Sequence, residues 1–444
     1  MRPFSAIGPL PLRWTATLTA LLLVVPAAVL LRSPRPKAEG LGRLLGQAAL
    51  LQSFPASPER PVPALWTQRL GPSLASSVWR AQSRVWWQFW GRDGDGGAFL
   101  AFPAQGYGSR ELPPHGLRVD DLVVVAPDPL SKQLLSDQLK LAQRQLRGLE
   151  QRCLQRLQQE QAVFWAPLGL GVMTGPMAPL LQRFQEGCLS LRLQGANLDL
   201  VGEASASGGI LATPGSTLPA TLPAPLPANL LLEWRGPALE GLLQGLFSRQ
   251  LIREPLAARY GIGEGQLALL GRAPFVLQLR PLAQGPFQAG LALQLAVPGD
   301  RQPWNRLLAG LQPALESQGL QGSAVGTQVL PALTWRRDDG QVVGGWRWVM
   351  PQGAAPQLLM YLGPEPQASR PAGGQDTLLQ ARPAALAAAG LLPSELPGPV
   401  RQASQLSLSA RSAAAAGRVL GSPLSQLMGR LELQPPPEPR PLSR

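Results

Sequence analysis

Apolar and polar residues alternate along several stretches in the second half of the chain. The run 287–297, FQAGLALQLAV, has an apolar residue at nearly every second position. Successive side chains of a strand point to opposite faces of a sheet, so this run predicts a half-buried strand. The shorter run 275–279 predicts its neighbour.

A hairpin is predicted where the sequence VLPALTWRRDDGQVVGGWRWVM turns at its Asp-Gly pair. Counting back from that turn puts Leu333 opposite Trp346 and Trp335 opposite Gly344. The tryptophans of this hairpin are therefore expected to face a core. Its arginines Arg336 and Arg347 are expected on the other face.

Helical periodicity is clearest in the run 131–162, where apolar residues recur every three or four positions. This spacing predicts one amphipathic helix whose apolar side must be covered by a sheet or another helix. Further helices are predicted at 72–90, 237–252 and 302–318.

A second hairpin is predicted in CLSLRLQGANLDLVGEA, where alternating leucines flank a turn at Gly195 and Ala196. The run 405–434 shows a similar Leu-Ser-Leu strand followed by another strand pattern. This likeness hints at two related halves.

The stretch SASGGILATPGSTLPATLPAPLPAN has no periodicity and is typical of a linker between domains. The fold class predicted for the whole chain is α+β, with an N-terminal transmembrane helix followed by antiparallel sheets packed with amphipathic helices. The predicted units are a membrane anchor at 1–37, a Pro/Ser-rich stalk at 38–63, a first α+β unit at 64–205, a Pro/Ala linker at 206–228, a second, strand-rich α+β unit at 229–434 and a disordered Pro-rich tail at 435–444.

The predicted anchor rests on WTATLTALLLVVPAAVLL, residues 14–31, which contains no charge. A helix of this length rises about 27 Å and can span a bilayer. A cleaved signal peptide is the alternative, but no good cleavage site precedes the basic cluster at 32–37. We therefore expect an uncleaved signal anchor that binds the lipid bilayer. The bulk of the single-pass chain is expected outside the cytoplasm, in a periplasm or lumen.

Charge does not indicate a nucleic-acid partner. The net charge is +13, but residues 1–37 hold five basic residues and no acidic one, which leaves a mild excess over the rest. The tryptophans fall mainly at alternating or helical positions that are expected to face a core, whereas nucleic-acid surfaces expose aromatic and basic groups together. We expect no nucleic-acid partner.

The two cysteines, Cys153 and Cys188, fit either an oxidising or a reducing compartment. A disulfide requires their Cα atoms to lie within about 7 Å of each other, which the sequence does not show. Two free thiols are the favoured reading.

A resemblance can be stated for the run LALLGRAPFVLQLRP…FQAGLALQLAVPG…LTWRRDDGQVVGGWRWVMPQG. Together with the anchor and the two α+β units, it resembles a cyanobacterial family of uncharacterised membrane-anchored proteins that is known only as a domain of unknown function. The resemblance covers 230–433 well and 95–205 weakly. It implies a large α+β domain outside the cytoplasm and names no substrate.

The sequence contains few residues that point to a catalytic or metal site. His115 is the single histidine, which excludes two-histidine metal centres and most histidine-relayed nucleophiles. The acidic stretch at 93–97 begins like a calcium loop but lacks its later ligands, so a tight acidic turn is expected. We predict no catalytic residue, cofactor or metal, and a chain that is not an enzyme.

The stretch SVWRAQSRVWWQFW holds four tryptophans among arginines. Such a composition is found both in binding surfaces and on the buried side of ordinary helices. On a helical wheel Trp79, Trp86 and Trp90 edge one apolar arc, while Trp87 falls on the arginine side. The helix is expected to pack on the domain's own sheet, or else to lie in the lipid headgroup region.

The predicted function follows from these points. The chain is expected to be a non-enzymatic binding protein or an envelope-associated protein. The alternative is a carrier or sensor of an apolar ligand such as lipid, held between leucine- and tryptophan-lined faces.

Overall fold

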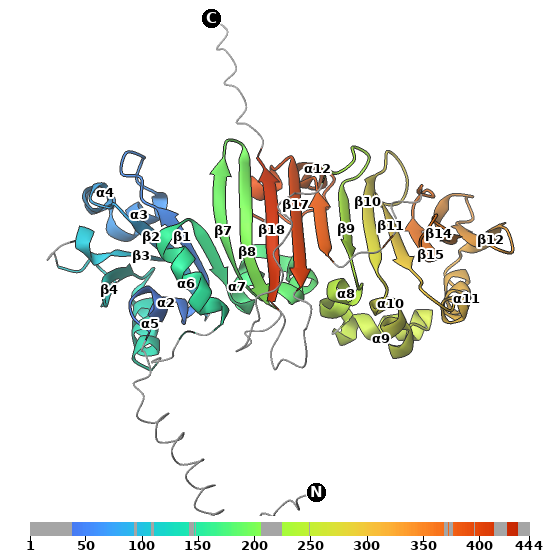
Figure 1. The fold of residues 1–444 in the computed structure, drawn as a ribbon, viewed down its shortest axis with the longest axis horizontal. Coiled ribbons are helices and arrows are strands. Elements are labelled where there is room, and N and C mark those ends of the chain that lie inside the picture. The colour runs from blue at the N-terminus through green and yellow to red at the C-terminus, as the bar shows by residue number, and fades with distance from the viewer. Residues whose placement is uncertain are drawn as a thin grey trace, which may run out of the picture.

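The computed structural model describes residues 38–92, 96–107, 111–141, 146, 148–205, 224–247, 249–367, 372, 376–394, 396–412 and 424–433. Their 18 strands form one antiparallel sheet that runs along the length of the molecule (Figure 1). The strands before the linker are β1 Ala48–Pro55, β2 Val85–Gly91, β3 Phe99–Pro103, β4 Gly116–Val119, β5 Leu122–Val125, β6 Ala162–Trp165, β7 Glu186–Gln194 and β8 Asn197–Ser205. Those after it are β9 Leu232–Gly236, β10 Phe275–Pro281, β11 Ala289–Ala296, β12 Gln321–Gly326, β13 Pro331–Arg336, β14 Val342–Val349, β15 Gln357–Leu362, β16 Thr377–Ala381, β17 Gln405–Ser412 and β18 Leu424–Glu432.

The strand order repeats on the two sides of the sheet's centre, where β8 pairs with β18. Outward from β8 the neighbours are β7, β6, β1, β2, β3, β5 and β4. Outward from β18 they are β17, β16, β9, β10, β11, β15, β14, β13 and β12. If β8 and β18 are each counted as the first strand of their half, β1 and β9, which come first in the sequence of each half, both lie fourth from the centre.

The central pairing is itself nearly symmetric. Gly202 of β8 lies opposite Leu427 of β18, and Leu200 of β8 lies opposite Gly429 of β18. A glycine is needed at position 202 because a Cβ there would lie 1.9 Å from the carbonyl oxygen of Cys188. The close approach at Gly202 is therefore between β8 and β7, inside the first half.

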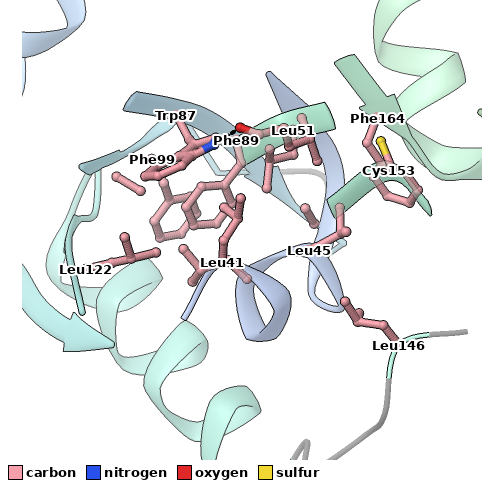
Figure 2. Close-up of a cluster of buried hydrophobic side chains, with 14 of the residues drawn as sticks. Leu41, Leu45, Leu51, Trp87, Phe89, Phe99, Leu122, Leu146, Cys153 and Phe164 are labelled. Carbon is pink, nitrogen blue, oxygen red and sulfur yellow. Dashed lines mark hydrogen bonds between the residues drawn. The ribbon is translucent and has the colours of Figure 1, made fainter. Parts of the chain in front are cut away.

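Helices cover both faces of the first half. The helices α2 Leu41–Leu45, α5 Pro129–Leu141 and α6 Leu149–Gln159 pack on one face, called here face A. Figure 2 shows this core, in which Trp87, Phe89 and Phe99 gather at one end and Cys153 and Phe164 at the other. The opposite face, face B, carries α3 Ala64–Leu70, α4 Pro72–Arg80, α7 Pro167–Thr174 and the 3-10 helix η2 Gly175–Phe184, and a second 3-10 turn, η1, spans Ala104–Gly106.

In the second half, helices lie on face B. Three helices pack there against Trp234, Phe275 and Trp348: α8 Glu240–Phe247, α10 Glu264–Gly271 and α11 Gln302–Glu316. The helix α9 Gln250–Tyr260 lies next to them. The short helices α12 Pro383–Ala388 and α13 Gly398–Arg401 complete this layer. The half-buried side chain of Leu181 contacts the apolar clusters of both halves, so the core is continuous across the centre.

The predicted fold class is wrong in its separate sheets. The sheets of the two predicted α+β units are one continuous 18-stranded sheet, because β8 and β18 pair edge to edge. In the described part of the chain, no helix is long and apolar enough to cross a membrane, and the run 14–31 lies outside that part. Alternation identifies strands but does not show which strands pair, so the join between the halves was not predictable from it.

Part of the predicted stalk is a central strand. Within 38–63, α2 and β1 belong to the first half, and β1 pairs with both β2 and β6. Of the predicted linker, 206–223 lies outside the described residues. Ala224 and Leu226 accept hydrogen bonds through their carbonyl oxygens from Gln380 and Arg382. The acidic turn at 93–95 and the tail at 435–444 also lie outside the description.

Several local predictions are confirmed. Leu333 lies opposite Trp346 and Trp335 opposite Gly344 in the β13–β14 hairpin. The β7–β8 hairpin, the pairing of β10 with β11, and α11 were also predicted. The helix predicted at 131–162 is wrong in its continuity, because α5 ends at Leu141 and α6 begins after Gly148, whose φ is +52°.

Candidate binding surface

The four tryptophans of the stretch SVWRAQSRVWWQFW do not lie on one helix. Helix α4 ends at Arg80 and strand β2 begins at Val85, so the predicted helix at 72–90 is wrong. The β-branched and aromatic run VWWQFW is typical of a strand buried on both faces. Alternation along β2 sends Trp87 to the face opposite Trp86, which explains why Trp87 did not fit the helical wheel.

Each tryptophan has a packing partner. Trp79 and Trp86 pack edge to face, with their ring centroids 6.2 Å apart, and both contact Trp66 on face B. Trp87 is buried on face A, and Trp90 is half-buried against the cluster that contains Leu170. Of these four, Trp79, Trp86 and Trp87 are each at most 5% exposed, so only the half-buried Trp90 leaves part of its ring at the surface.

Cys153 of α6 and Cys188 of β7 form a disulfide, with their Cα atoms 5.8 Å apart. The reading of two free thiols is therefore wrong. The bond fastens α6 to face A at the inner edge of the first half. Beyond α6, face A of the central strands carries polar and charged side chains.

The first ion pairs on this open face join neighbouring strands. Arg430 of β18 donates from Nε to Oδ1 of Asp199 on β8 at 2.7 Å. Arg192 of β7 donates to Glu160 at 3.2 Å, and Ser190 donates to the same carboxylate. Arg192, Asp199 and Arg430 lie in one row across three adjacent strands.

Two further carboxylates repeat this arrangement. Glu203 of β8 pairs with Arg152 of α6 at 3.4 Å, and Arg156 lies 3.9 Å from it. Arg411 of β17 donates two hydrogen bonds to Asp376. Between these rows lie Val201 and Met428, directly opposite each other in the β8–β18 pair. We call the residues of this surface, Arg152, Arg156, Glu160, Ser190, Arg192, Asp199, Val201, Glu203, Asp376, Arg411, Met428 and Arg430, the ion-paired face.

Arginines form the outer layer of much of the ion-paired face. The side chain of Arg192 is 70% exposed and that of its partner Glu160 is 30% exposed, and Arg430 is likewise more exposed than Asp199. The hydrogen bonds to Asp376 and Asp199 raise the pKa of Arg411 and of Arg430 above the ordinary value. These bonds hold the guanidinium groups of Arg411 and Arg430 in place, while about a third of each side chain stays exposed.

The other side of the same strands is lined with leucine. Leu193, Leu198, Leu431 and Leu406 are neighbours in one row across β7, β8, β18 and β17 on face B. Leu193 is 62% exposed and Leu198 is half-buried. In the next row, Leu200 and Leu408 are half-buried and lie on either side of Gly429. This set of six leucines around Gly429 is called the leucine face.

Other sequence candidates do not join these surfaces. His115 lies in the turn before β4 with a φ of +59°. In the described part of the chain, no group of three or more His, Cys, Asp or Glu side chains is placed to hold a metal ion. The paired charges of the ion-paired face were missed in the sequence because partners such as Asp199 and Arg430 are 231 positions apart. For the members on strands, such as Asp199 and Arg430, the only signal is a polar position in an alternating strand.

Comparison with known proteins adds no relative: no family model, curated protein or solved structure matches the chain.

Proposed function

We propose that this chain is a non-enzymatic binding protein that works outside the cytoplasm and binds a protein partner through the ion-paired face. The observation that carries the proposal is a set of partly exposed arginines on face A of the central strands, each paired with a carboxylate. Fixed charge pairs of this kind favour specific recognition, because a wrong partner leaves charges unmatched.

The same arrangement disfavours acid–base catalysis. A catalytic carboxylate needs a pKa near the working pH and access to a substrate proton. On the ion-paired face, the carboxylate oxygens of Asp376 and Asp199 instead accept hydrogen bonds from Arg411 and Arg430, which occupy the atoms that a substrate proton would have to reach.

The disulfide supports the proposed compartment. Cys153 and Cys188 pair between a helix and a strand of the core. Disulfides persist in oxidising compartments and are rare in a reducing cytoplasm. An extracytoplasmic site of action accounts for a buried structural disulfide.

A charge-reversal experiment tests the binding proposal. The variant Arg192→Glu/Arg430→Glu changes two arginines of the ion-paired face, and the control Arg80→Glu/Arg259→Glu changes two exposed arginines on helices. Both variants alter the net charge equally. Cross-linked cell envelopes are solubilised, and the proteins that co-purify are quantified by mass spectrometry. The proposal predicts one partner that is lost in the first variant and retained in the control; equal recovery from both variants would contradict it.

A second candidate function is a carrier of an apolar ligand such as a lipid. The leucine face favours it, because Leu198, Leu200 and Leu408 remain half-buried and Leu193 is largely exposed. Native mass spectrometry of the purified chain would show a bound lipid. The variant Leu200→Gln/Leu408→Gln should lose that lipid and Leu134→Gln, an exposed leucine on α5, should retain it. Absence of lipid from the unmodified chain would refute the carrier function.

A further inference from the structure

One end of the sheet is an unprotected edge strand. β12 pairs on one side with β13, from Gln321 opposite Arg336 to Gly326 opposite Pro331. Among the described residues, no strand lies on its other side. All six residues of β12, including Val325, are exposed, and the exposed side chain of Val329 follows the strand in the sequence.

The opposite end of the sheet is protected. β4 has four residues, follows two prolines and carries Arg118, and the helix α5 contacts it. Short strands, prolines, charges and covering helices are the means by which proteins prevent pairing at a sheet edge. β12, whose sequence is QGSAVG, contains no proline and no charged residue and is six residues long. The helix α11 contacts it, but all six of its residues stay exposed.

The charge pattern indicates what pairs with β12. From Ser317 to Trp335 the chain contains no charged residue. An identical strand running antiparallel therefore meets β12 without repulsion, and a twofold axis at Ala324 brings this small side chain opposite its own copy. The central β8–β18 pair shows that the halves of this sheet already join by the same antiparallel edge pairing.

We propose that β12 pairs with β12 of a second copy of this chain about a twofold axis, forming a dimer with one continuous sheet. A twofold contact uses the same edge in both copies, so it closes both edges and stops further growth. The protected β4 edge at each outer end keeps the assembly a dimer and not a fibre. This inference concerns a different part of the molecule from the ion-paired face and does not depend on the proposed function.

Sedimentation velocity of the full chain in a non-ionic detergent tests the dimer. The 47.3 kDa chain should sediment as a dimer that dissociates on dilution. The variant Ala324→Lys places like charges across the twofold pair and should raise the dissociation constant at least about tenfold. The control Ala309→Lys adds the same charge at an exposed position on α11 and should leave the dimer unchanged.

Two results would overturn the proposal. One is a chain that stays monomeric at the highest concentration reached, even if its β12 edge binds another protein. The other is a dimer that Ala324→Lys and Ala309→Lys affect equally. Circular dichroism of both variants confirms that the fold is kept, so loss of the dimer is not mistaken for unfolding.

Discussion

The indole Nε1 of Trp87 donates a 2.8 Å hydrogen bond to the carbonyl oxygen of Leu157, 70 residues further along the chain. Leu157 lies in the last turn of α6, where helix carbonyls have no partner within the helix. One side chain of β2 thereby caps the helix that also carries Cys153. The bond fixes α6 over face A, next to the ion-paired face.

The variant Trp87→Phe should lower the free energy of unfolding by about 1–3 kcal/mol, because a buried carbonyl is left without a donor. The matched control is Trp66→Phe, since Trp66 is fully buried and its Nε1 has no hydrogen-bond partner among the described residues. Chemical denaturation measures both. Equal losses in the two variants would show that the hydrogen bond contributes nothing beyond packing.

Reduction of the disulfide should destabilise the first half. Cys153 and Cys188 close a loop of 35 positions, and bonds of this kind stabilise proteins by about 2–4 kcal/mol. The double variant Cys153→Ser/Cys188→Ser should unfold at lower denaturant, and a reducing agent should shift the unmodified chain but not the variant. Insensitivity of the unmodified chain to the reducing agent would contradict the disulfide.

Gly202→Ala should destabilise the centre of the sheet. A Cβ at this position would lie 1.9 Å from the carbonyl oxygen of Cys188, so the β7–β8 backbone must shift, at a cost of about 1–3 kcal/mol. Gly171→Ala in α7 is the control, because nothing lies within 4 Å of its Cβ position and alanine favours a helix. Thermal unfolding should show a lower midpoint for the first variant and an unchanged or higher one for the second.

Tyr361 should make stability fall at alkaline pH. Burial raises the pKa of this phenol above its usual 10.0, and Thr334 hydrogen-bonds to its hydroxyl. The unfolded chain therefore loses this proton first, so stability declines as the pH rises above 10. The variant Tyr361→Phe should show a smaller decline in unfolding free energy over that range. An identical decline in both proteins would show that Tyr361 is not responsible.

The pairing of strands that are neighbours in the sequence could be predicted, whereas the central strand β1 could not. The β13–β14 hairpin has alternation on both sides of an Asp-Gly turn, so Leu333 and Trp346 could be paired by counting. In β1 both Leu50 and Leu51 are buried, one on each face, so no alternation marks the strand. The same loss of alternation in β2 let Trp86 and Trp90, but not Trp87, fit the apolar side of a helical wheel.

The ion-paired face depended on the pairing of β8 with β18, which joins positions more than 200 residues apart. Asp199 and Arg430 become partners only once this pairing is known. A polar residue in an alternating strand shows that its side chain faces outward. It does not show what lies across the next strand.

The most direct test of the account is site-specific photo-crosslinking in living cells. A photoreactive residue replaces Val201, 48% exposed in the middle of the ion-paired face, or Leu168, 45% exposed on α7 on the other side of the sheet. Binding through the ion-paired face predicts a covalent adduct with one envelope protein from position 201 and none from position 168. No adduct from position 201, or the same adducts from both positions, would contradict binding through the ion-paired face.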